Sequence, residues 1–218
     1  MLRLIFVSVL VTTLVAGAFY LFTPEGRQFI DRVTINWDRQ ENRGHFRAGR
    51  PLPGTPDLNR FSARMSKAGV KPGMPVHIRI YKLESEIELW VQKNSRFERF
   101  ATYPICMWSG RLGPKLKEGD RQAPEGFYTV TKDALNPNSI EHLSFNLGFP
   151  NVYDRGKGRT GSFLMVHGGC ASIGCYAVTD GVVDELWAFV TAALDNGQAR
   201  IPVHAFPFRM TDKNLRLR

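Results

Sequence analysis

Residues 166–176, VHGGCASIGCY, place one imidazole and two thiols in a single glycine-rich turn. A free thiol has a pKa near ~8.5 and is mostly protonated at neutral pH, so a nucleophilic cysteine needs a base beside it. His167 is the candidate base. Because glycine lacks side-chain bulk, the backbone amides of Gly174 and Cys175 are expected to approach a substrate oxyanion. The turn therefore predicts cysteine-based acyl transfer.

Two other interpretations of the turn stay open at this point. Cysteine is one of the most often buried residue types, and a histidine after an apolar run is often an ordinary strand-end residue. His167, Cys170 and Cys175 also have the spacing of metal ligands. A tetrahedral zinc site needs a fourth ligand, for which the sequence offers Cys106, His204 or an acidic residue. We favour the nucleophile and expect neither a metal nor a cofactor.

The turn resembles the signature of the L,D-transpeptidase catalytic domain, the YkuD-type family, in which a His-Gly pair precedes a Ser-x-Gly-Cys element. His167 and Gly168 fill the pair, and the tetrapeptide that ends at Cys175 fills the element. The resemblance implies that Cys175 is the nucleophile and His167 its base. It also implies that Gly174, Ser172 and Gly168 form the oxyanion hole and support the site.

The turn departs from the commoner family pattern in three ways. Ile173 stands where a second histidine is usual, Tyr176 is not followed by the usual arginine, and His167 lies only eight positions before Cys175. These departures resemble a periplasmic sub-branch of YafK-like proteins. Seven further segments also resemble this sub-branch: YPIC (103–106), LGPK (112–115), GD (119–120), APEGFY (123–128), GFPN (148–151), YDR (153–155) and PFRMTD (207–212). The resemblance runs from about Val76 to the end of the chain.

From Pro75 onward, apolar residues alternate with polar ones, which is typical of strands with one buried face. We expect strands at 76–81, 86–92, 97–103, 126–131, 161–167, 175–178 and 200–208, with His77 and His204 facing solvent. Pro202 and Pro207 favour an edge position for the last strand. One amphipathic helix is expected from Thr179 or Asp180 to Gly197. These expectations describe a mostly β, mainly antiparallel domain with one packed helix, an L,D-transpeptidase-like β sandwich or barrel.

Four regions divide the chain. Residues 1–22 carry one early arginine and then an uncharged, mostly apolar run, so we expect an exported, periplasmic protein. The run is either a cleaved signal peptide or a retained membrane anchor, because nineteen residues approach the length of a bilayer span. A basic connector is expected at 23–75, with short helices at 25–33 and 58–68. The catalytic domain follows at 76–208, and a basic tail at 209–218.

The chain has 218 residues, 43% of them hydrophobic, which is ample for a buried core and excludes a disordered chain. The formal net charge of +9 favours anionic partners. No nucleic-acid-binding motif is present, so carboxylates of cell-wall peptides or lipid headgroups fit better. Arg155 and Arg159, with Tyr176, are expected to contact the substrate, and ion pairs of either arginine with Asp154 or Glu125 are the alternative.

Three cysteines in an oxidising compartment leave at least one unpaired. A disulfide between Cys106 and Cys170, with Cys175 free, and a free structural Cys106 both remain open. In either case Cys175 is expected to be the thiol essential for turnover.

The expected chemistry passes through a thioester on Cys175. If an amine attacks the thioester, the enzyme is a transpeptidase that forms peptidoglycan cross-links or attaches protein to the wall; if water attacks, it cuts an existing link. The resemblance to YafK-like proteins implies the second outcome, release of an outer-membrane lipoprotein from the diaminopimelate of peptidoglycan. A non-catalytic wall-binding module is the alternative of a different class.

Overall fold

The computed structural model describes residues 12–13, 15, 17–19 and 23–217 of the chain. Most of the apolar segment 1–22 therefore lies outside the described residues. In the described part of the chain, no helix is long and apolar enough to cross a membrane.

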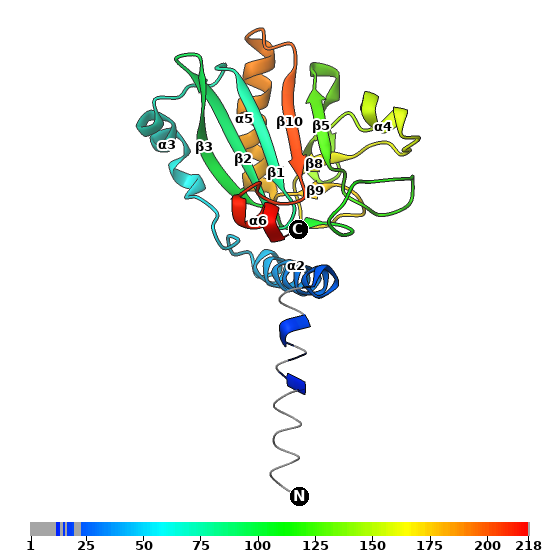
Figure 1. Ribbon diagram of the computed structural model, residues 1–218. Helices are drawn as coiled ribbons and strands as arrows, with labels where there is room; N and C mark the ends of the chain where they lie inside the picture. Colours follow the sequence, from blue (N-terminus) through cyan, green and yellow to red (C-terminus); the bar gives the residue numbers. More distant parts are fainter. Residues whose placement is uncertain (1–11, 14, 16, 20–22, 218) are drawn as a thin grey trace, which may run out of the picture.

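Two mixed five-stranded sheets form the body of the protein (Figure 1). The first has the order β3(Arg96–Pro104), β2(Glu86–Lys93), β1(Val76–Tyr81), β10(Ile201–Phe206), β5(Gly126–Val130). The second has the order β4(Met107–Trp108), β9(Tyr176–Ala177), β8(Met165–His167), β7(His142–Asn146), β6(Leu135–Ser139). All pairs are antiparallel except β1 with β10 and β8 with β9. The expected mostly β architecture is confirmed, and the described strands do not close into a barrel.

One core joins both sheets to helix α5(Asp180–Asp195). Alternate side chains of β1 and β2 are fully buried, as the period of two predicts. Leu186, Phe189 and Val190 of α5 are fully buried as well, and Figure 1 shows α5 running behind the first sheet. The amphipathic stripe predicted for this helix is therefore the face that covers the sheet.

Two expectations about the first sheet are wrong. His77 is only 8% exposed, because its ring packs edge-to-face against His204 and Phe97. The last strand, β10, lies between β1 and β5 and not at an edge. Pro202 is tolerated there because the ladder to β1 begins only after it, at the pairing of Ile78 with Val203.

The region before β1 contains a long helix, α2(Pro24–Arg47), which extends well beyond the expected 25–33. Thr23 caps it by accepting a hydrogen bond from the Gly26 amide, and Pro24 suits the first helical position. Ile35 is buried against the domain, and Asn42 Nδ2 donates to the Ile105 carbonyl at 3.1 Å. Much of the expected connector is therefore packed on the domain.

The remaining helical segments are short: η1(Leu58–Arg60), α3(Phe61–Ala68), η2(Lys132–Ala134), α4(Val152–Gly156) and α6(Asp212–Leu217). Phe61 at the start of α3 packs edge-to-face on Phe189 of α5. The helix expected at 58–68 is thus present as η1 followed by α3. The start of the predicted basic tail is also attached to the domain, because Arg209 forms ion pairs with Glu86 and Glu88.

Candidate active site

The candidate nucleophile and base are brought together by two adjacent parallel strands, β8 and β9. Val166 pairs with Tyr176, and both side chains are fully buried in the core. His167 pairs with Ala177, and Cys175 lies directly before β9. Because side chains alternate along a strand, His167 and Cys175 are both on the face opposite Val166 and Tyr176, two positions apart in register. The Met165 amide donates to the Cys175 sulfur at 3.4 Å, and the thiol donates to the Phe163 carbonyl at 3.5 Å.

The tautomer of His167 follows from its one short hydrogen bond. Nδ1 lies 2.7 Å from the Gly168 carbonyl oxygen, which can only accept, so Nδ1 carries the hydrogen. The lone pair is then on Nε2, the nitrogen free to take a proton. Burial lowers the pKa of His167 despite the opposing effect of the Gly168 carbonyl. The imidazole is therefore neutral at neutral pH, as a general base must be.

The Cys175 thiol is half-buried, and burial raises its pKa above the usual 9.0. The Met165 amide and the positive charge of Lys115 act in the opposite direction and stabilise the thiolate. The resting pair is consequently a neutral thiol and a neutral imidazole. Such a pair generates the thiolate only as the proton moves to histidine, at the moment of attack.

Ser172 holds the turn that presents the thiol. Its hydroxyl donates to the Cys175 carbonyl at 2.7 Å, accepts from the Gly174 amide at 3.2 Å and lies 3.3 Å from the Ser109 hydroxyl. The expected oxyanion role of Gly174 is therefore corrected, because its amide is already engaged. Glycine is needed at 174 for shape: φ is +155°, and a Cβ would lie 3.1 Å from Leu164 Cδ1.

The loop after His167 is fastened to the start of α5. The Gly169 amide donates to Asp180 Oδ1 at 2.7 Å, and the Gly168 amide donates to the Leu143 carbonyl at 3.2 Å. The carboxylate of Glu141 lies over Gly169, where an added Cβ would be 2.3 Å from Oε2. Gly168 thus supports the site through both its amide and its carbonyl. Sequence reasoning considered Asp180 only as a helix cap and missed Glu141 entirely.

Lys115 is a further site residue that the sequence did not reveal. It is 4% exposed, and its Nζ contacts Asp120 Oδ1 at 2.5 Å and the Lys117 carbonyl at 3.1 Å. It comes from the loop between β4 and β5, some sixty residues before Cys175 in the chain. The LGPK motif (112–115) contains Lys115, but neither its spacing nor any known chemistry of that motif connects it to the thiol, so only the fold could reveal the relationship.

Cys106 and Cys170 form a disulfide, and Cys175 is free. This decides the alternative that the sequence left open. It also removes the zinc interpretation, because an oxidised Cys170 cannot ligate a metal as a thiolate. No cluster of three or more histidine, cysteine or acidic side chains that could hold a metal occurs among the residues that the structure describes.

The residues expected to contact the substrate lie differently. Tyr176 is fully buried, with its hydroxyl donating to the Pro124 carbonyl at 2.6 Å, so its expected substrate contact is wrong. Arg159 forms the alternative ion pair, 2.7 Å from the buried Asp154. Arg155 is exposed and donates to the Pro150 carbonyl. All three side chains are thus engaged by partners within the chain.

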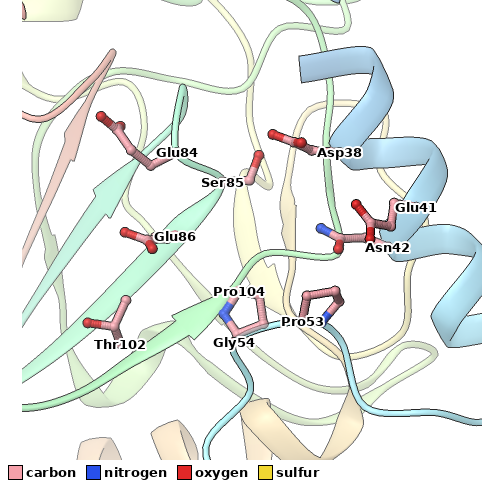
Figure 2. A pocket seen from close by; sticks show the side chains of 10 residues that line it. All are labelled: Asp38, Glu41, Asn42, Pro53, Gly54, Glu84, Ser85, Glu86, Thr102 and Pro104. Atoms are coloured by element: carbon pink, nitrogen blue, oxygen red, sulfur yellow. The ribbon is translucent and has the colours of Figure 1, made fainter. Parts of the chain in front are cut away.

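A separate hollow of about 340 Å³ lies between α2 and the end of the first sheet (Figure 2). Its lining is acidic, with Asp38 and Glu41 on α2 opposite Glu84 and Glu86. His167 and Cys175 are not part of it. The Arg209 amide donates to Glu84 and the Arg209 guanidinium donates to Glu86. These two acidic side chains of the hollow therefore already have partners within the chain.

A free thiol and a neutral imidazole on one face of two adjacent parallel strands are the groups that a cysteine-nucleophile site needs. The model of the L,D-transpeptidase catalytic domain, YkuD, matches residues 75–203. The chain belongs to this family.

Two curated relatives, each named "Putative L,D-transpeptidase YafK", come from Escherichia coli (strain K12) and Escherichia coli O157:H7. Each is 47% identical over 144 residues, which cover 66% of this chain and 58% of the relative. The chain thus spans less than two thirds of the length of the curated relatives it matches.

Two solved structures are also similar. The helical cell shape determining protein Pgp2 from Campylobacter jejuni has a TM-score of 0.47, at 18% identity over 68% of this chain and 56% of its own. Bd1075 of Bdellovibrio bacteriovorus has a TM-score of 0.44, at 19% identity over 62% of this chain and 49% of its own.

Proposed function

We propose that this protein is a cysteine acyl-transfer enzyme that acts on the diaminopimelate-containing stem peptides of peptidoglycan. The family supplies the substrate class. The observation that carries the chemistry is the hydrogen bond from His167 Nδ1 to the Gly168 carbonyl, because it leaves Nε2 free as a base on the strand face that also carries the free thiol of Cys175.

The first half-reaction forms a thioester. His167 Nε2 takes the proton of the Cys175 thiol while the sulfur attacks the carbonyl carbon of the scissile peptide bond. The tetrahedral intermediate collapses as its C–N bond breaks, and the imidazolium returns its proton to the departing amine. The acyl group is then bonded to sulfur, and His167 is again neutral.

In the second half-reaction, His167 Nε2 takes a proton from the incoming nucleophile, which attacks the thioester carbonyl; the C–S bond breaks and the thiol is re-formed. We infer that the nucleophile is water, so that the enzyme releases wall-bound lipoprotein. The resemblance to YafK-like proteins supports this, and so does Ile173. That side chain is 81% exposed beside the nucleophile and has no polar group to hold an acceptor amine.

The test incubates the full chain with sacculi that carry covalently attached lipoprotein, followed by mass spectrometry of the muropeptides. We expect loss of the protein adduct, with freed tripeptide ends and no new dimers. Cys175→Ala should abolish release, whereas Lys117→Met, a loop change outside the Cys175–His167 pair, should retain it. New diaminopimelate dimers would identify a cross-linking transpeptidase, and sacculi that bind the protein unchanged would identify a wall-binding module.

The proposed location is the periplasm, with residues 1–22 as export signal or anchor and 76–208 as the catalytic domain. The uncharged run from Leu4 to Phe22 supports export, and so does the disulfide, since disulfides persist in oxidising compartments. A fusion of residues 1–40 to a reporter that is active only after export should be active. An inactive reporter would contradict the proposed location.

A further inference from the structure

Helix α2 has an apolar face that points away from the domain. Ile30, Val33 and Trp37 are 37%, 52% and 72% exposed, and their spacing of three and four residues places them on one stripe. Ile35, on the inner face, is 3% exposed. At about 100° per residue, Val33 and Trp37, two residues before and after Ile35, are each rotated by about 200° from it, in opposite directions. Both therefore lie on the side of the helix that faces away from Ile35. The stripe is therefore directed outward.

Basic side chains run along one edge of this stripe. Arg32, Arg43 and Arg47 are exposed and recur at helical spacing on the same flank. An apolar stripe that contains a tryptophan and has arginines along one edge, with Glu41 at the other, resembles a helix that lies in a membrane interface. Charge complementarity then favours a surface of anionic headgroups.

The position of α2 in the chain points to the same surface. The nineteen residues from Leu4 to Phe22 contain no charge, and α2 begins two residues later, at Pro24. If the apolar run inserts in a bilayer, α2 follows it directly in the chain and is the helix that lies nearest to the bilayer surface.

We propose that the outer face of α2, formed by Ile30, Val33 and Trp37, lies in the headgroup region of an anionic lipid bilayer. Arg32, Arg43 and Arg47 contact lipid phosphates, and Ile35 holds the helix to the domain. The catalytic domain is then held against the membrane through a helix face, in addition to any anchoring by the apolar run. This surface is independent of the proposed reaction.

The test uses the full chain reconstituted in vesicles of phosphatidylethanolamine and phosphatidylglycerol, with bromine on the acyl chains close to the headgroups. Bromine quenches tryptophans in the interface. The chain has four tryptophans, so each contribution is assigned by substitution. We expect bromolipid to quench the tryptophan fluorescence of the wild-type chain, and we expect Trp37→Phe to abolish this quenching. The matched control Trp187→Phe, at a partly exposed position of α5, should leave the quenching unchanged.

Two further variants test the face and its charge. Val33→Glu should weaken the quenching of Trp37, whereas Ile140→Glu, at a fully exposed position between β6 and β7, should not. Arg43→Gln should weaken the binding constant of the helix face for anionic vesicles, measured from the quenching, about fivefold. Quenching that survives Trp37→Phe would overturn the proposal, because α2 would then stand away from the bilayer. Protection of Trp37 from an aqueous quencher without any bromolipid effect would indicate that a second copy of the chain covers this face, and would overturn the proposal as well.

Discussion

Lys115 and Asp120 form an ion pair of 2.5 Å in the loop beside the nucleophile. Burial opposes the charge on Asp120, but hydrogen bonds from Lys115 and from three backbone amides lower the pKa of that carboxyl to about 2. The carboxylate therefore stays charged throughout the working pH range and fixes the lysine in place. Lys115 is a positioning charge, which acts through the Cys175 sulfur and makes no bond to substrate in our mechanism.

Removing this charge should raise the pKa of the thiol. We expect Lys115→Met to move the midpoint of Cys175 alkylation by iodoacetamide to higher pH, because a positive charge that stabilises the thiolate is lost. Lys117→Met, two residues along the same loop, is the control. A purely structural role for Lys115 would lower the folded fraction and leave the alkylation midpoint of the remaining folded enzyme unchanged.

The neutral pair predicts a characteristic pH profile. Because burial lowers the pKa of His167, the acid limb of kcat/KM should have its midpoint below 6.5. Because burial raises the pKa of Cys175, alkylation of the resting enzyme should titrate above 9.0. A resting thiolate–imidazolium pair would instead give fast alkylation near neutral pH, and that result would contradict the neutral resting pair.

The disulfide should matter for stability more than for chemistry. It joins the end of β3 to the loop between His167 and Cys175 across 64 residues. Cys106→Ser or Cys170→Ser should each cost about 2–5 kcal/mol of unfolding free energy, measured by urea titration. Turnover should persist in the folded fraction, because neither sulfur touches the reacting atoms. Complete loss of turnover in a folded variant would show that the bridge positions the nucleophile.

His77 should destabilise the protein in acid. Burial, then the charges of His204 and Arg79, lowers its pKa to about 4. Between pH 6.5 and 4 the unfolded chain therefore binds a proton that the folded protein does not, so stability falls as the pH falls. This amounts to roughly 2 kcal/mol between pH 7 and pH 5.

His77→Gln should remove that part of the dependence of the unfolding free energy on pH. Urea titrations at pH 7 and pH 5 measure this dependence as a slope. The control His142→Gln should not flatten it, because the hydrogen bond that His142 donates to Asp184 raises the pKa of His142. An unchanged slope in His77→Gln would mean that His77 is protonated in the folded protein.

The candidate pair, His167 and Cys175, could be named from the sequence because its members are close in the chain and lie in a recognisable turn. Lys115 and Glu141 could not, because they reach the site from loops that only the folded chain brings near. Helix α2 was underestimated for another reason: its inner face carries polar Asp31 and Asn42, while apolar Trp37 points outward. This inverts the usual pattern, so the helix did not look like part of a packed domain.

The oxidised protein carries a single reactive sulfur, since two of its three cysteines are joined and Cys175 is free. A maleimide or a disulfide reagent will therefore label one position per molecule. The extent of labelling counts intact active sites in a preparation without any substrate. The same property makes the protein an addressable target for electrophilic inhibitors, whose occupancy can be measured by intact mass.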